Sequence, residues 1–124
     1  MYAIDTPTGS VQPKDYEPAR VITARTFEVV RVIDGDTIVV TYDSEPASVR
    51  LVAINTPERG EPGYDRATDA MRQLAQGEVV RLTFTNPTDK RDDFGRPLAT
   101  VEANGQDVGK AMLRQGLAEP YHER

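Results

Sequence analysis

Four short polar motifs in this sequence combine the residue types that hydrolysis of a phosphodiester requires. They are Asp-Gly-Asp-Thr at residues 34–37, Arg-Leu at 50–51, Asn-Thr-Pro-Glu at 55–58 and Asp-Asp-Phe-Gly-Arg at 92–96. Together they offer oxygen ligands for a hard metal ion, a carboxylate that could serve as general base and two arginines for phosphate. Because each motif is common by itself, the hypothesis depends on their combination within one small domain.

The metal ligands that we expect come from two of these motifs. Asp34 and Asp36 flank a glycine, and two carboxylates this close repel each other unless a cation lies beside them. Asn55 offers a side-chain carbonyl and Thr56 a backbone carbonyl, and a hard cation accepts both. The competing interpretation is an Asp-Gly hairpin with solvated carboxylates. The sequence does not contain the ligand spacing of an EF-hand loop.

Three charged residues and one tyrosine complete the candidate site. Pro57 restricts the backbone before Glu58, so Glu58 is either a general base that projects from a rigid corner or an ordinary turn carboxylate. Arg50 lies in an apolar strand and needs an anionic partner, which is either a substrate phosphate or a structural carboxylate. Arg96 follows a glycine and either binds phosphate or marks a charged loop tip. Tyr121 either stacks on a nucleic-acid base or covers the end of the barrel.

The composition of the chain excludes or disfavours several kinds of functional site. The chain has 124 residues, enough for one domain, with no cysteine and a single histidine, His122. Thiolate metal sites are excluded, and a histidine zinc site or a serine–histidine–aspartate triad is disfavoured. The net charge of −5 argues against a protein that coats DNA with a basic face. A nuclease stays compatible with it, because a bound cation and a few arginines can reverse the potential of one cleft.

The N-terminal residues predict no membrane association. Residues 1–20 lack the apolar stretch of a signal peptide, and no segment of the sequence resembles a membrane span. We therefore expect a cytoplasmic protein unless a leader has been removed.

Residues 1–25 are rich in Pro, Thr and Asp and predict an N-terminal arm that is poorly ordered or pinned to the barrel. Residues 26–124 predict a single folded domain.

Hydrophobic patterns predict the elements that must position the motifs. Alternating and β-branched runs predict five strands, at residues 27–33, 37–42, 49–54, 79–84 and 97–103. Asp34-Gly35 predicts the first hairpin turn, and residues 43–47 predict a polar loop. Helical spacing predicts two helices, one at 64–76 and one that starts behind Asp107 and ends at Gly116. This order indicates an α+β fold: a five-stranded OB-type β-barrel with a helix between strands 3 and 4 and a C-terminal helix.

Taken in order, the four motifs and the run Leu-Arg-Gln-Gly-Leu-Ala at residues 113–118 resemble the staphylococcal nuclease (thermonuclease) family. The resemblance covers about residues 26–118. It implies an OB-type barrel and a Ca²⁺-dependent nuclease. Such an enzyme hydrolyses single- or double-stranded DNA and RNA with little sequence preference and leaves 3′-phosphates. We expect it to act as a monomer.

The resemblance also implies a role for each matching residue. The implied metal ligands are Asp36, Asn55 and Thr56, with Asp34 as a supporting carboxylate nearby. The implied general base is Glu58, and the implied phosphate-binding residues are Arg50 and Arg96.

Two departures from the family's pattern affect the site. Asn55 stands where the family usually has an aspartate, so we expect weaker Ca²⁺ binding. The loop between Glu58 and the first helix is short, which predicts an open substrate rim. The alternative function is a catalytically weak or silent nucleic-acid-binding module on the same barrel, and a structural or protein-binding module is third. Glu58, Arg50 and Arg96 favour the enzyme, because a pure binding module has no need for a carboxylate aimed at phosphate.

Overall fold

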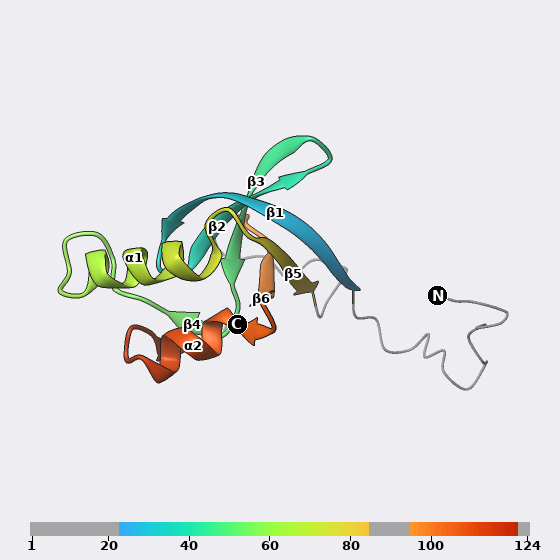
Figure 1. Ribbon diagram of the computed structural model, residues 1–124. Coiled ribbons are helices and arrows are strands. Elements are labelled where there is room, and N and C mark those ends of the chain that lie inside the picture. Colours follow the sequence, from blue (N-terminus) through green and yellow to red (C-terminus); the bar gives the residue numbers. More distant parts are fainter. Residues whose placement is uncertain (1–22, 85–94, 122–124) are drawn as a thin grey trace, which may run out of the picture.

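The computed structural model describes residues 23–84 and 95–121, which form a closed β-barrel with two helices (Figure 1). The six-stranded sheet has the order β3-β2-β1-β5-β6-β7, and a further pairing of β3 with β6 closes the barrel. This closing pair is parallel, with Arg50 opposite Leu98, whereas β1, β2, β3, β5 and β6 otherwise pair with antiparallel neighbours. The main strands are β1 (Thr23–Asp34), β2 (Thr37–Tyr42), β3 (Glu45–Leu51), β5 (Val79–Phe84) and β6 (Leu98–Ala103).

The first two hairpins are tighter than their sequences suggest. Asp34 pairs with Thr37, so the first turn consists of residues 35–36, one position later than the expected Asp-Gly pair. The predicted loop at 43–47 is wrong, because Asp43 and Ser44 alone make the second turn, with φ of 50° and 68°. Short polar side chains tolerate this left-handed conformation better than most. The third strand therefore starts earlier than predicted, at Glu45.

The third strand also ends earlier than predicted. β3 stops at Leu51, and the chain turns through Ala53, whose φ is 69°. It then enters the two-residue strand β4 (Ile54–Asn55), which pairs with β8 (Glu119–Pro120) near the C-terminus. The Tyr121 backbone N–H extends this pairing and donates to the Ala53 carbonyl at 2.8 Å. The motif at 55–58 is thus held by a strand pair distant in sequence.

Two helices cover the barrel as predicted. The first helix, α1 (Tyr64–Ala75), buries Met71 and Ala75 completely, and the chain leaves it through Gly77 at φ 79°. The second, α2 (Val108–Arg114), follows the short strand β7 (Gln106–Asp107). The Asp107 carboxylate accepts the Lys110 backbone N–H at 2.9 Å, which confirms its predicted role as N-cap.

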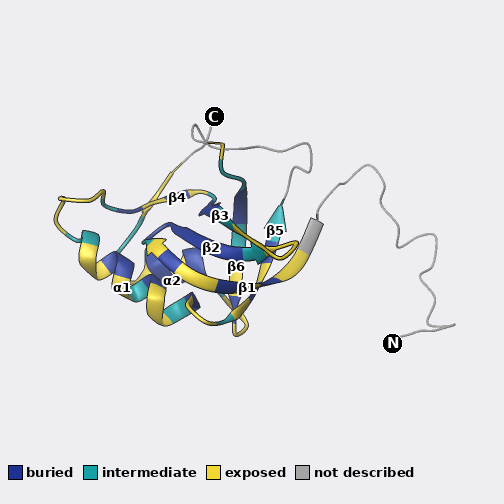
Figure 2. Ribbon diagram, turned by 90° about the horizontal axis from the view of Figure 1, so that it is seen from above, coloured by how far each residue is buried: buried dark blue, intermediate teal, exposed yellow. Residues whose placement is uncertain are grey.

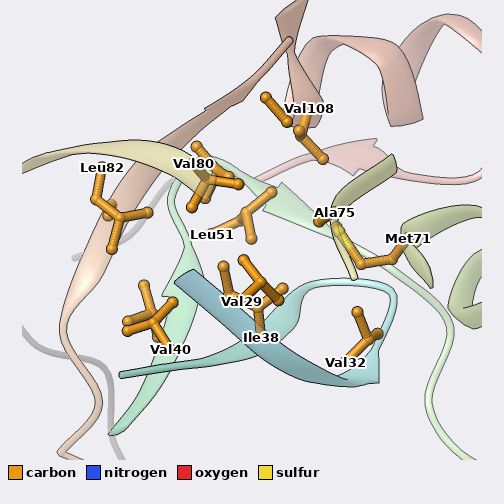
Figure 3. Close-up of a cluster of buried hydrophobic side chains, with 14 of the residues drawn as sticks. Val29, Val32, Ile38, Val40, Leu51, Met71, Ala75, Val80, Leu82 and Val108 are labelled. Carbon is orange, nitrogen blue, oxygen red and sulfur yellow. The ribbon is translucent and has the colours of Figure 1, made fainter. Parts of the chain in front are cut away.

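The core fills the barrel and continues beneath both helices (Figures 2 and 3). Strand residues such as Ile38 and Leu82 are fully buried, together with Met112 of α2. Complete burial of a side chain of this size stabilises the fold by about 1.5–3 kcal/mol. Tyr42, the last residue of β2, is 45% exposed and stacks against Phe27, with the ring centroids 6.0 Å apart.

The observed architecture confirms the predicted α+β fold with an OB-type barrel, and adds the short strands β4, β7 and β8. Of the expected N-terminal arm, residues 1–22 lie outside the described residues, whereas 23–25 begin β1. Residues 85–94, which include Asp92, Asp93 and Phe94 of the fourth motif, lie outside them as well, and so does His122. Within residues 23–84 and 95–121, no helix is long and apolar enough to cross a membrane.

Candidate active site

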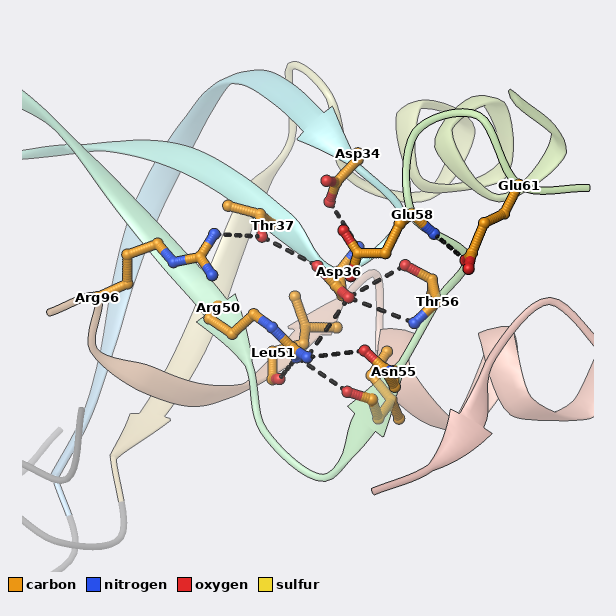
Figure 4. A network of polar contacts seen from close by, with 11 residues as sticks. Asp34, Asp36, Thr37, Arg50, Leu51, Asn55, Thr56, Glu58, Glu61 and Arg96 are labelled. Carbon is orange, nitrogen blue, oxygen red and sulfur yellow. Dashed lines mark hydrogen bonds and ion pairs between the residues drawn. The ribbon is translucent and has the colours of Figure 1, made fainter. Parts of the chain in front are cut away.

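Asp36 lies at the centre of a hydrogen-bonded network that joins three of the four motifs directly (Figure 4). Asp36 is only 7% exposed, and both of its carboxylate oxygens accept hydrogen bonds. Oδ2 accepts from the Thr56 backbone N–H at 3.3 Å and from the Thr56 hydroxyl at 3.1 Å. Oδ1 accepts from the Thr37 hydroxyl at 3.0 Å. The turn after β1 and the segment after β4 are therefore locked together through one carboxylate.

Gly35 allows this approach because it has no side chain. A Cβ at Gly35 would lie 2.8 Å from the Ala67 Cβ and 2.9 Å from the Thr56 hydroxyl oxygen. Both distances are shorter than real side-chain contacts, so any larger residue would push α1 and Thr56 away. The glycine of this motif serves close packing of the site, whereas sequence reasoning assigned it to turn geometry.

Arg50 is a buried arginine whose guanidinium is held by backbone carbonyls close to it in sequence. Nη1 donates to the carbonyls of Leu51 and Ile54, at 2.6 and 2.9 Å. Nη2 donates to the Asn55 side-chain oxygen at 3.3 Å and lies 3.5 Å from Asp36 Oδ2. Of the two partners that the sequence left open, the structure therefore contains the carboxylate. Because the Nη2 contacts are longer, this nitrogen is better placed than Nη1 to exchange its partners for a phosphate oxygen.

Arg96 reaches the same network through a hydroxyl. Its Nη1 donates to the Thr37 hydroxyl oxygen at 3.1 Å, and that hydroxyl donates to Asp36. Thr37 is completely buried and links the start of β6 to the turn after β1. Sequence reasoning noted this threonine within its motif but assigned it no role. A β-branched hydroxyl residue directly after an acidic turn was the available signal.

Glu58 lies on the exposed rim of the network, in the loop before α1. Its backbone N–H donates to the Glu61 carboxylate at 2.7 Å, and the Glu61 N–H donates back to the Glu58 carbonyl at 2.9 Å. The Glu61 carbonyl in turn accepts from the Tyr64 N–H, at the start of α1, at 3.2 Å. Glu61 thus ties Glu58 to the helix, a contact that sequence reasoning missed.

Asp34 shows that the carboxylates of the site are crowded. Burial, followed by the repulsion of Asp36, raises its pKa from 3.8 to about 6, and Glu58 adds a smaller repulsion. Asp34 Oδ1 also accepts the Asp36 backbone N–H at 3.2 Å, which lowers the pKa but does not offset the other causes. Asp36 and Glu58 therefore both repel the partly buried Asp34 carboxylate, and a cation beside it would relieve this repulsion.

The donor set fits a hard cation rather than a soft one. Asp36, Asn55 and Thr56 offer only oxygen atoms, as Ca²⁺ prefers. Within residues 23–84 and 95–121, however, no group of three or more His, Cys, Asp or Glu side chains is arranged to hold a metal ion. A cation here would therefore depend on the amide and backbone oxygens and on water for part of its coordination shell.

Tyr121 lies next to the site because β8 pairs with β4. Glu119 is opposite Asn55, and Tyr121 follows two residues later, bonded through its backbone to Ala53. Its side chain is 45% exposed, so the ring is accessible rather than buried under the barrel. The exposed Tyr121 ring is therefore free to stack on a nucleic-acid base. It lies on the Asn55 side of the network.

The comparisons with known sequences agree with one another on the family that this chain resembles. The family described as staphylococcal nuclease homologue matches residues 48–124, a range that includes Arg50, Asn55, Glu58 and Arg96. The chain is 38% identical over 96 residues to an uncharacterized endonuclease of Escherichia coli O157:H7. It is 40% identical over 103 residues to protein ParB of Escherichia coli, and 32% identical over 100 residues to the thermonuclease of Staphylococcus hyicus.

The matches leave part of each relative uncovered. They include 77%, 76% and 76% of this chain, but 60%, 56% and 58% of the three relatives in the same order. The chain thus spans somewhat more than half the length of these relatives.

Proposed function

The chain belongs to the staphylococcal nuclease family, and on that basis we propose that it hydrolyses phosphodiester bonds in DNA and RNA. The observation that carries the proposal is the network around Asp36. Arg50 and Arg96 both connect to this carboxylate, directly or through Thr37. Glu58 is close enough to the neighbouring Asp34 to contribute to the rise in its pKa. Phosphoryl transfer requires positive groups around the phosphate and a base for the attacking water. The two guanidinium groups, the carboxylate at the exposed rim and the Asp36 carboxylate as a metal ligand match these requirements.

Each residue has a distinct part in the proposed reaction. Glu58 accepts a proton from the attacking water, a contribution of about 10²–10⁴-fold for a positioned general base. The oxygen of that water bonds to phosphorus, and the bond from phosphorus to the 5′-oxygen breaks, so the phosphate stays on the 3′ side. The departing 5′-oxygen takes up a proton from solvent and becomes a hydroxyl. Arg50 and Arg96 stabilise the charge on the phosphate oxygens and on the leaving oxygen.

The proposed cofactor is Ca²⁺, held by Asp36, Asn55 and Thr56 with water. When bound, it supplies a Lewis acid that attracts a phosphate oxygen and offsets the charge developing at phosphorus. Asp34 helps to position Asp36, because its carboxylate accepts a hydrogen bond from the Asp36 backbone N–H. Tyr121 is the proposed stacking surface for a substrate base. We propose that the enzyme acts as a monomer.

A cleavage assay tests this function. Single-stranded DNA is incubated with the protein in Ca²⁺ or in EDTA, and the products are identified by mass. We expect calcium-dependent fragments that end in 3′-phosphates. A mobility shift without cleavage would instead support the alternative of a silent binding module, for which the amide of Asn55 is the observation in favour.

The variant Glu58→Gln separates catalysis from binding. The hydrogen bonds that fix Glu58 use its backbone atoms, so the fold should survive the change. We expect a loss of turnover by about 10²–10⁴-fold with an unchanged melting temperature. Unchanged turnover would remove Glu58 from the role of general base.

A further inference from the structure

The loop at residues 57–63, between the site and α1, presents an arginine that the network does not use. Arg59 directly follows Glu58 and is exposed. Its guanidinium carbon lies 5.7 Å from the centroid of the Tyr64 ring, so the cation rests on the aromatic face. The pair therefore extends the charged surface of the site beyond the general-base candidate, toward the start of α1.

The loop is braced without this contact. Glu61 exchanges hydrogen bonds with Glu58, and its carbonyl accepts from the first residue of α1. Gly60 and Gly63 have φ of 91° and 92°, a left-handed conformation that fixes the two bends of the loop. A Cβ at Gly63 would lie 3.2 Å from Pro57, which shows how closely the two ends of the loop approach. Arg59 is thus presented by a fixed backbone, and the loop does not need its side chain for closure.

The charge of Arg59 is not neutralised by an acidic partner in the described part of the chain, although Glu58, Glu61 and Asp65 are near it in sequence. Arg72 gives the contrast, because its guanidinium pairs with Asp69 at 2.8 Å on the exposed face of α1. A guanidinium with one face on an aromatic ring keeps its N–H edge and its other face available. Phosphate oxygens bind the edge, and a nucleic-acid base stacks on the face.

We propose that Arg59 and Tyr64 form a binding subsite for single-stranded nucleic acid on the α1 side of the reacting phosphate. This inference rests on the proposed function and extends it. Tyr121 lies at the β4–β8 pair and Arg59 at the loop before α1, so the strand would pass across the Asp36 network between them. The subsite takes part in binding and does not touch the reacting atoms.

Binding measured without cleavage tests the subsite. A fluorescent single-stranded DNA of twelve nucleotides is titrated with full-length protein in EDTA, anisotropy is followed at several salt concentrations, and a gel confirms intact DNA. We expect Arg59→Ala to raise the dissociation constant about fivefold and to reduce the salt-dependence slope by about 0.7, the share of one phosphate on a single strand. Arg59→Gln should do the same, and it keeps a long polar side chain if alanine perturbs the loop.

Arg72→Ala is the matched control, because it removes the same charge from an exposed position on α1 that already has an acidic partner. An equal effect of Arg72→Ala and Arg59→Ala would overturn the proposal, since net charge alone would explain it. No effect of Arg59→Ala or Arg59→Gln would overturn it as well.

The tyrosine separates the subsite from a purely structural contact. Tyr64→Phe keeps the aromatic face and should bind DNA as the original protein does, whereas Tyr64→Leu should weaken binding about threefold. A structural contact would instead lower the melting temperature in Arg59→Ala and leave DNA affinity unchanged, which would overturn the proposal. Cleavage by the unaltered protein decides the proposed function separately, because these binding measurements do not require turnover.

Discussion

Arg50 and Asp36 form a buried ion pair at the seam of the barrel. Arg50 Nη2 lies 3.5 Å from Asp36 Oδ2, and each side chain is 10% exposed. The same Arg50 is opposite Leu98 in the parallel pairing that closes the barrel. Removing one partner of such a pair leaves the other charge buried and uncompensated. The pair therefore contributes to the fold as well as to the site.

This coupling predicts a non-additive effect on stability. In EDTA, Arg50→Met should lower the free energy of unfolding by about 3 kcal/mol, because Asp36 stays buried without its cation. Asp36→Asn should cost less, since Arg50 keeps the carbonyls of Leu51 and Ile54. The double variant should recover about 1–2 kcal/mol relative to the sum of the single changes. Urea denaturation of the four proteins measures this difference, and strictly additive losses would contradict the coupling.

Asn55→Asp tests whether the amide is a metal ligand. A carboxylate adds one negative charge where the donor set is otherwise short of charge, so the Ca²⁺ dissociation constant should fall roughly tenfold. Activity at low calcium should rise with it. The control Gln106→Glu adds the same charge on β7, beyond the other end of β6 from Arg50. Calorimetry that finds equal or weaker Ca²⁺ binding in Asn55→Asp would exclude this position from the coordination shell.

The sequence predicts the fold where local pattern decides it. Strand β2 and strand β5 have their predicted bounds, because alternation and turn residues at both ends are local signals. The pairing of β4 with β8 was not predictable in this way, since two residues have no period and their partner lies more than 60 positions away. Ala53 at φ 69° gives no signal either, because alanine rarely adopts that conformation.

The same limit applies to the site. Residue types and spacing identified Asp36, Arg50 and Arg96 as candidates, and the structure brings them into one network. What spacing could not reveal is how they are connected. Thr37 transmits the contact from Arg96 to Asp36, a relation that depends on tertiary geometry. Nor could the sequence show that Arg50 has a carboxylate partner before any substrate binds.

Glu61 should influence turnover although its carboxylate is committed to the Glu58 backbone. Glu61→Ala removes the acceptor of the 2.7 Å bond and frees the loop before α1, so Glu58 loses its fixed position. We expect kcat to fall about tenfold with little change in KM, because misplacing a catalytic group affects the reacting geometry more than substrate binding. Glu61→Gln keeps an oxygen acceptor and should restore most of the rate. Equal kcat in Glu61→Ala and the original protein would show that this bond does not position the base.

Asp34 gives the metal-free protein a defined dependence of stability on pH. Its pKa is raised from 3.8 to about 6, so the folded state holds the proton more tightly than the unfolded state does. The associated stability is therefore fully present below pH 4 and is lost as the pH rises through 6. In EDTA at pH 7.5, Asp34→Asn should then be more stable than the original protein, by about 1 kcal/mol once solvent screening of a half-buried group is allowed for. The amide retains an oxygen for the Asp36 backbone N–H, so this contact does not confound the comparison.

The Asp34→Asn advantage should vanish at pH 3.5, where the carboxyl is protonated in both states. It should also shrink when Ca²⁺ is added at pH 7.5, because a bound cation offsets the repulsion that raises the Asp34 pKa. Thermal unfolding of both proteins between pH 3.5 and 7.5, with and without calcium, gives the difference directly. A difference that stays constant across this range would mean that Asp34 is not crowded by Asp36 and Glu58 in solution. A difference that is pH-dependent but indifferent to calcium would place the cation elsewhere than beside these carboxylates.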